Sequence, residues 1–234
     1  MASLYLSEYL ESASVGDSIM LEGDEAKHAV AVARTRIADR LAIGNGRGLV
    51  ASGVVSSLDP FALTVEHVRV EPLPDPQLWL VQALAKGDRD ELAVQAATEL
   101  GVSGVIPWAA ERSVSRWEGA KLEKGRLRWE AIVREASKQS IRAWTPVVEP
   151  LATTKQVSGF VLDPTASIAL TEVALPTEGR ITLVVGPEGG ISPRELELLE
   201  QQGSVRVRLG SEILRTSTAG PAAIAVLNAR LGRW

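Results

Sequence analysis

The residues whose types and spacing could do chemistry lie in two short segments near the C-terminus. The first is LVVGPEGG at 183–190, where an apolar run leads into a loop with Gly186, Gly189 and Gly190 ahead of a capped helix. Glycine has no Cβ and accepts positive φ, so such a loop lets a ligand approach the backbone closely. Taken alone, the same residues fit a tight strand-to-helix turn equally well. The loop is not a P-loop, because no Gly-Lys-Ser/Thr follows it.

The second segment is LGSEILRTSTAG at 209–220, in which a short apolar run ends in a loop before the last helical pattern. Arg215 is followed by Thr216, Ser217 and Thr218, whose hydroxyls suit either helix capping or contact with a polar ligand. Together the two segments indicate more than either alone, because strand ends that lead into glycine-containing loops mark the ligand-binding edge of an open α/β sheet.

The composition removes several kinds of site. The chain has no cysteine, which excludes disulfides, thiolate metal sites and covalent cysteine mechanisms, and His28 and His67 lie 39 positions apart. Two isolated imidazoles do not make a metal pair or a catalytic dyad, so we predict no bound metal and a structural role for each histidine.

No apolar run approaches the roughly 18 residues that span a bilayer, and the N-terminus lacks a signal-peptide pattern, so we expect a cytoplasmic protein without membrane contact.

The middle of the chain is locally basic, although the formal charge of the whole chain is −4. From Arg112 to Arg142 there are nine Lys or Arg against four Glu, an excess of five positive charges. A solvated face of an amphipathic helix explains this pattern, and so does a surface that contacts nucleic-acid phosphates.

The elements that must position these residues fall into two regions separated by EPLPDP at 71–76, whose three prolines cannot sustain a regular ladder or helix. We therefore predict domains at 1–72 and 73–234. The first contains five short β-type runs, SLYL, SIML, RLAI, LVASGVV and FALTVEHVRV, with one helix expected at 24–36. Its GNGRG at 44–48 has no helix after it and is read as a hairpin turn rather than a nucleotide fingerprint.

The second region alternates strands and helices, which predicts an α/β fold with crossover helices. Strands are expected at WLVQAL (79–84), GVIPW (104–108), FVLDP (160–164), ITLVVG (181–186) and VRVRL (205–209). Asp88 with Glu91 predicts a capping box before DELAVQAATEL, and Gly101 is placed to end that helix. Further helices are expected at 119–140, from Pro193 to about Gln202 behind a Ser192 cap, and at 217–231.

LVVGPEGGISPREL followed by LGSEILRTSTA closely resembles the RsmE-like family of 16S ribosomal RNA uridine N3-methyltransferases, within the SPOUT superfamily. The resemblance covers nearly the whole chain, because KGDRDELAVQAATELGV at 86–102, ERS at 111–113 and EASKQSIR at 135–142 also match segments of that family. It implies an N-terminal PUA-like β-barrel that contacts RNA and a C-terminal SPOUT domain with a mostly parallel sheet and a deep trefoil knot. General topology rules disfavour a knot, and periodicity does not indicate one.

The resemblance also implies a site for S-adenosylmethionine. Its predicted lining residues are Leu162, Gly186, Pro187, Glu188, Gly189, Gly190, Leu209, Gly210, Ile213, Leu214 and Thr216, with the segment Leu162 to Pro164 as a third wall. RNA contacts are predicted from Arg112, Arg116, Lys121, Lys124 and Arg142. The chain departs from the family pattern at Ser211-Glu212 and Ser217, where typical members have Pro-Arg and Glu, and its LYL lacks an N-terminal Arg-x-Phe.

Methyl transfer from a sulfonium is an in-line displacement, which requires orientation and exclusion of water rather than a metal or redox group. Arg215 is the candidate for stabilising charge on uracil or positioning it, and Glu188 is a candidate base with an equally plausible structural role. Without cysteine, methylation at pyrimidine C5 is closed. The alternatives are a SPOUT ribose 2′-O methyltransferase and a noncatalytic RNA-binding module. The expected partners are 16S ribosomal RNA or the small subunit, and a second copy of the chain through the Ala-rich last helix.

Overall fold

The structure, a computed structural model, describes residues 3–234 and divides into two compact units. The first comprises the chain up to Leu73 together with Ser137–Thr145, and the second comprises Pro74–Ala136 and Pro146–Trp234. The assignment of separate roles to 1–72 and 73–234 stays a prediction. No helix in the described part of the chain is long and apolar enough to cross a membrane.

The first unit is built on a five-stranded sheet of order β1-β3-β4-β5-β2. Its strands are β1 (Ser3–Leu6), β2 (Ser18–Met20), β3 (Arg40–Gly44), β4 (Leu49–Leu58) and β5 (Phe61–Val70), which confirms all five predicted runs. All pairs are antiparallel except β1 with β3. The predicted hairpin turn joins β3 to β4, where Gly46 and Gly48 have φ of 67° and 101°.

The helix predicted at 24–36 is shorter than expected. It consists of α1 (Gly23–Lys27) and a wide π-type turn, η1 (His28–Val32), in which the Ala33 N–H donates to the carbonyl of His28. Arg34 then has a φ of 54°, in the left-handed region, so the helix cannot continue to 36. The apolar pattern that predicted a helix to residue 36 therefore continues beyond Val32, the last helical residue.

The segment Ser137–Thr145 belongs to the first unit through specific contacts. Lys138 Nζ lies 3.1 Å from Glu25 Oε2, with both side chains largely buried. The Trp144 indole N–H donates to the carbonyl of Glu71, and its ring lies 2.9 Å from where a Cβ on Gly48 would stand. A side chain at position 48 would therefore displace the indole.

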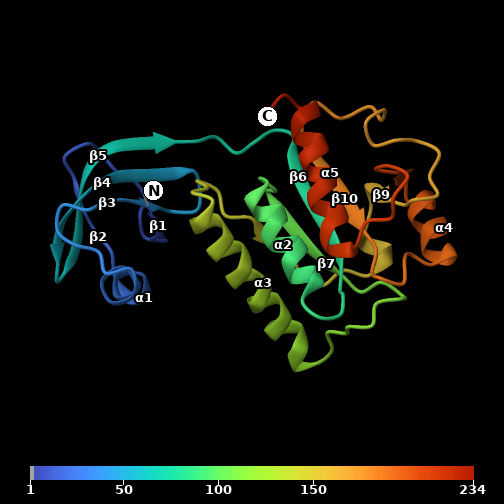
Figure 1. The fold of residues 1–234 in the computed structure, drawn as a ribbon, viewed down its shortest axis with the longest axis horizontal. Coiled ribbons are helices and arrows are strands. Elements are labelled where there is room, and N and C mark those ends of the chain that lie inside the picture. The colour runs from blue at the N-terminus through green and yellow to red at the C-terminus, as the bar shows by residue number, and fades with distance from the viewer. Residues whose placement is uncertain (1–2) are drawn as a thin grey trace. The chain divides into compact units, whose positions relative to one another are not determined.

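The second unit is built on a six-stranded parallel sheet of order β11-β9-β10-β6-β7-β8 (Figure 1). Its strands are β6 (Gln77–Ala83), β7 (Gly104–Trp108), β8 (Val147–Val148), β9 (Phe160–Leu162), β10 (Arg180–Val185) and β11 (Val205–Val207). The predicted mostly parallel α/β sheet is confirmed, and five of these strands are the ones expected from the sequence.

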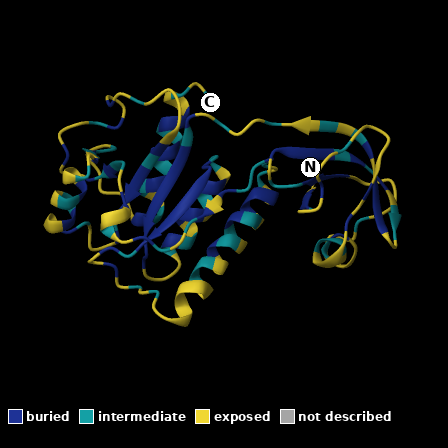
Figure 2. Ribbon diagram, turned by 180° about the vertical axis from the view of Figure 1, so that it is seen from behind, coloured by how far each residue is buried: buried dark blue, intermediate teal, exposed yellow. Residues whose placement is uncertain are grey.

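The strands of this sheet are coloured buried in Figure 2, and apolar clusters lie on both of its faces. Along β6, Leu78 and Leu80 pack in one core with α2 (Arg89–Glu99), α3 (Ala120–Gln139) and α5 (Thr216–Arg230). Trp79 and Val81 point to the other core, which includes α4 (Pro193–Gln201). A short 3-10 helix, η2, spans Thr154–Gln156. Burial on both faces explains why these strands read as continuous apolar runs.

The two predicted helix caps have different outcomes. At α4 the Ser192 Oγ accepts from the Glu195 N–H, the Glu195 carboxylate accepts from the Ser192 N–H, and Pro193 is the first helical residue, as expected. At α2 the expected capping box is wrong: Asp88 has a left-handed φ of 60° and its side chain caps nothing. The Asp90 carboxylate instead accepts from the Ala85 and Glu91 N–H groups.

Candidate cofactor and substrate site

Three loops of the second unit meet at one edge of its sheet. Strands β11, β9 and β10 are parallel neighbours, so their carboxyl ends lie at the same edge. The segments that follow them, after Leu162, Val185 and Val207, surround a cavity of about 560 Å³. This is the position at which open α/β sheets bind ligands.

The cavity brings together ten of the eleven residues predicted to hold the cofactor. They are Leu162, Gly186, Pro187, Glu188, Gly190, Leu209, Gly210, Ile213, Leu214 and Thr216, and Arg215 lines it too. Asp163 and Pro164, from the expected third wall, are present as well. Sequence reasoning missed Arg89, Val185, Ile191, Leu196, Glu212 and Ala219. That these residues bind a ligand stays a prediction.

Gly189 is the predicted residue that does not line the cavity. A Cβ at this position would lie 3.2 Å from the Cβ of Arg112, whose guanidinium donates to the Gly189 carbonyl at 3.0 Å. Gly186 does line the cavity, and a Cβ there would lie 2.6 Å from Ile191 Cγ1. The close packing of Ile191 therefore makes glycine necessary at 186.

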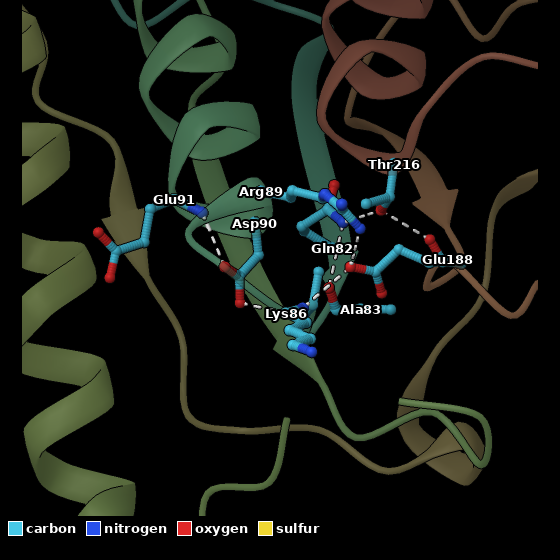
Figure 3. Close-up of polar contacts among 10 residues, drawn as sticks. Gln82, Ala83, Lys86, Arg89, Asp90, Glu91, Glu188 and Thr216 are labelled. Carbon is cyan, nitrogen blue, oxygen red and sulfur yellow. Dashed lines mark hydrogen bonds and ion pairs between the residues drawn. The ribbon is translucent and has the colours of Figure 1, made fainter. Parts of the chain in front are cut away.

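Thr216 joins the two glycine-containing loops to the centre of the sheet. Its hydroxyl donates to the Gly186 carbonyl at 2.8 Å and accepts from Gln82 Nε2 at 2.8 Å. Gln82 is fully buried at the end of β6, and its amide also donates to the Ala83 carbonyl. Figure 3 shows Gln82 reaching Thr216 at the start of α5. One buried hydroxyl thus fixes three segments relative to one another.

Glu188 is held by the loop that leads into α2 (Figure 3). Its Oε1 accepts from the Lys86 N–H at 3.0 Å and from the Arg89 guanidinium at 2.8 Å. Burial raises the pKa of the Glu188 carboxyl, but hydrogen bonds from its own N–H, from Lys86 and from Arg89 outweigh burial, so the pKa lies below its ordinary value. Glu188 is therefore a carboxylate that accepts hydrogen bonds and a weak base.

The sequence did not identify Arg89 as a cavity residue, because the strand order that brings it to the cavity is known only in the folded chain. Arg89 follows β6, which pairs in parallel with β10. The carboxyl end of β6 therefore lies at the same sheet edge as the GPEGG loop, which follows β10. The capping box predicted at 88–91 involved Asp88 and Glu91 and gave Arg89 no role.

Asp163 forms a second paired charge in the cavity wall. Its Oδ2 accepts from Arg206 Nε at 2.7 Å, and its Oδ1 accepts from the N–H and hydroxyl of Thr165. Burial raises the pKa of the Asp163 carboxyl, but the contacts with Thr165 and Arg206 outweigh burial and the pKa lies below its ordinary value. These contacts fix the turn that follows β9.

Arg215 immediately precedes α5 and is exposed, with its backbone carbonyl accepting from Thr218 and Ala219. Within residues 3–234 its guanidinium has no hydrogen bond or ion pair. A cavity-lining cation without a partner in the chain is free to contact a substrate.

The predicted RNA-contact residues differ in their surroundings. Arg112 and Arg116 are exposed and donate to backbone carbonyls of Gly189 and Glu111. Lys121 and Lys124 are exposed on the first turns of α3. Arg142 belongs to the first unit and is half-buried, and burial lowers its pKa to about 10. Four of the five thus lie in the second unit, and their RNA contacts stay a prediction.

The part of the chain that the structure describes contains no group of three or more His, Asp or Glu side chains that could hold a metal ion. The cavity's charged residues are instead three carboxylates and two guanidiniums.

Comparison with known proteins matches both units. Residues 71–228 match a family described as an RNA methyltransferase domain, and residues 21–66 match an RNA methyltransferase PUA domain. The sequence is 38% identical to Ribosomal RNA small subunit methyltransferase E of Mycobacterium bovis over 94% of this chain and 89% of that protein. It is 30% identical to the Bacillus subtilis protein of the same name over 85% of each chain.

Among solved structures, the chain is similar to Ribosomal RNA small subunit methyltransferase E from Neisseria gonorrhoeae bound to S-adenosyl methionine. The TM-score is 0.86 with 26% identity, and the match covers 98% of each chain. Both matched domains and the relatives that cover most of the chain point to an RNA methyltransferase. The paired loops at the sheet edge are consistent with these matches. The chain belongs to the ribosomal RNA small subunit methyltransferase E family of RNA methyltransferases.

Proposed function

We propose that the protein transfers a methyl group from S-adenosylmethionine to N3 of a specific uridine in 16S ribosomal RNA. The observation that carries this proposal is the cavity at the carboxyl edge of the parallel sheet, lined by the GPEGG and ILRT segments. The Neisseria gonorrhoeae relative, which is similar along nearly its whole length, is described as bound to S-adenosyl methionine.

The cavity suits this cofactor. Its volume of about 560 Å³ falls in the usual range of small-molecule sites, roughly 300–1,000 Å³. Backbone groups of the segments at 186–190 and 209–214 are available to hold an adenosine, since a Cβ on Gly190 would meet no atom within 4 Å and one on Gly210 would meet only Glu212 Oε2, at 3.6 Å. When bound, S-adenosylmethionine supplies an electrophilic methyl group on its sulfonium sulfur.

The chain's own residues then orient the substrate and manage charge. Attack by uracil N3 requires loss of its proton, and negative charge spreads to O2 and O4. The unpaired Arg215 guanidinium is suited to stabilise that charge, while Glu188 is already committed to Lys86 and Arg89. We therefore assign Arg215 to the substrate and Glu188 to positioning of the GPEGG loop. Apolar lining residues such as Leu162 and Leu209 exclude water.

Mass spectrometry of ribosomal RNA nucleosides from cells with and without the gene tests the product. N3-methyluridine should disappear on deletion, and reverse transcription should cease to stall at one uridine, because an N3-methyl blocks the Watson–Crick edge. A ribose 2′-O-methylnucleoside as the product would replace the N3 assignment by the alternative within the superfamily. An unchanged nucleoside profile would favour a noncatalytic RNA-binding module.

Arg215→Ala tests the assignment of the guanidinium. We expect turnover to fall about a hundredfold or more with cofactor affinity retained, as for a group that acts on the transition state. A loss of cofactor affinity with unchanged turnover would place Arg215 in the cofactor site instead.

We further propose that the first unit is a PUA-like barrel that contacts RNA and that the second contains the trefoil knot, in a cytoplasmic protein. A homodimer is proposed through α5. Gly220 and Ala223 of this helix are buried within their own unit, while Ala222 and Ala225 are half-buried and Ala229 is exposed. Light scattering at micromolar concentration should give twice the chain mass, and a fully active monomer would contradict the dimer.

A further inference from the structure

Five charged side chains line the cavity, and most of them are neutralised by partners in the chain. Arg89 and Glu188 pair with each other at 2.8 Å. Asp163 is paired with Arg206 at 2.7 Å. The remaining two are Glu212 and Arg215, which have no hydrogen bond or ion pair within residues 3–234. The cavity thus offers one free carboxylate and one free guanidinium.

The Glu212 carboxylate lies beside the end of β11. A Cβ built on Gly210 would stand 3.6 Å from Glu212 Oε2, so the carboxylate is next to cavity-lining backbone. Glu212 is exposed, which places it at the rim of the cavity rather than in its depth. No lysine or arginine of the described chain is paired with it, so its charge is available to a ligand.

We propose that Glu212 binds the ammonium group at the amino-acid end of the methyl donor. This inference rests on the proposed function. An RNA phosphate would be repelled by a carboxylate, whereas the methyl donor is the cationic reactant. Its sulfonium must lie where water is excluded for methyl transfer. The ammonium group of the methyl donor can remain partly hydrated. It can therefore pair with an exposed carboxylate such as that of Glu212. Glu212 therefore acts on cofactor affinity, separately from the role of Arg215 toward the substrate.

Calorimetry with three ligands tests this assignment on the intact protein. S-adenosylmethionine carries both an ammonium and a sulfonium, S-adenosylhomocysteine keeps only the ammonium, and 5′-methylthioadenosine has neither. Glu212→Gln should weaken binding of the first two by about three- to tenfold, the range expected for one partly exposed charge-assisted hydrogen bond, and leave the third unchanged. The losses should shrink at high salt, because ions screen an exposed pair.

Glu197→Gln is the matched control, because Glu197 is exposed on α4 and does not line the cavity. It removes the same charge and should leave all three affinities unchanged. Equal affinities of wild type and Glu212→Gln for S-adenosylmethionine would overturn the inference, and so would a loss confined to S-adenosylmethionine, which would indicate the sulfonium. If the wild-type protein itself binds neither S-adenosylmethionine nor S-adenosylhomocysteine, the proposed function fails instead.

Discussion

Replacing Thr216 by valine tests whether one hydroxyl holds the cavity together. Valine has the shape of threonine but neither donates to the Gly186 carbonyl nor accepts from Gln82 Nε2, two contacts of 2.8 Å each. Each lost hydrogen bond costs about 1 kcal/mol, so we expect the free energy of unfolding to fall by about 2 kcal/mol. For a unit of this size that loss lowers the melting temperature by roughly 4–8 °C.

Thermal unfolding followed by circular dichroism measures the change, with calorimetry for cofactor affinity. Thr216→Ser keeps the hydroxyl and should recover most of the stability. Thr218→Val is the matched control, because Thr218 is exposed two positions along the same helix. If Thr216→Val melts with the wild type and binds the cofactor equally well, the hydroxyl does not connect β6 to the GPEGG loop as argued.

Three further predictions concern the same unit. Gly186→Ala should lower cofactor affinity at least about tenfold by calorimetry, because its Cβ would stand 2.6 Å from Ile191 Cγ1; unchanged affinity would show that the loop adjusts freely. Glu188→Gln should lower the melting temperature at pH 7. Because the pKa of Glu188 is depressed on folding, its contribution is present above the unfolded pKa of about 4.3 and is lost as pH falls through the folded pKa, so the difference should vanish in acid. Lys121→Glu with Lys124→Glu should reduce the salt slope of RNA binding by about two if both contact phosphate, whereas an unchanged slope would assign α3 a solvated face.

The elements that sequence patterns predicted well are those whose signals are local. Ser192, Pro193 and Glu195 lie within four residues and specify the start of α4 by themselves. The buried strands were also recognisable, because a strand covered on both faces is apolar at every position, as along β6 and β10.

In two other places the local sequence pattern predicted the wrong structure, because the backbone conformation there depends on contacts that the sequence does not show. Asp88 has the residue type of a cap, yet it takes a left-handed φ and Asp90 binds the backbone instead. The apolar run after His28 continues past the point where Arg34 ends the helix. These outcomes depend on backbone conformation rather than on hydrophobic periodicity.

The sequence predicted those cavity residues that belong to one of the two C-terminal motifs. It missed residues that reach the cavity from distant segments of the chain. Arg89 lies 99 positions from Glu188, and their ion pair follows from the adjacency of β6 and β10. Gln82 lies 134 positions from Thr216. Because strand order is not encoded in any single segment, such partners become visible only in the folded chain.

The position of β11 at one end of the sheet affects the protein during its synthesis. β11 has three residues and β8 two, so the finished sheet ends in strands too short to offer much of a template to another chain. While the ribosome has made β9 and β10 but not Val205–Val207, β9 is the edge of the sheet, because β11 is its outer neighbour. β9 also has only three residues, so a nascent chain that has not yet reached β11 still ends its sheet in a strand too short to pair extensively with another molecule.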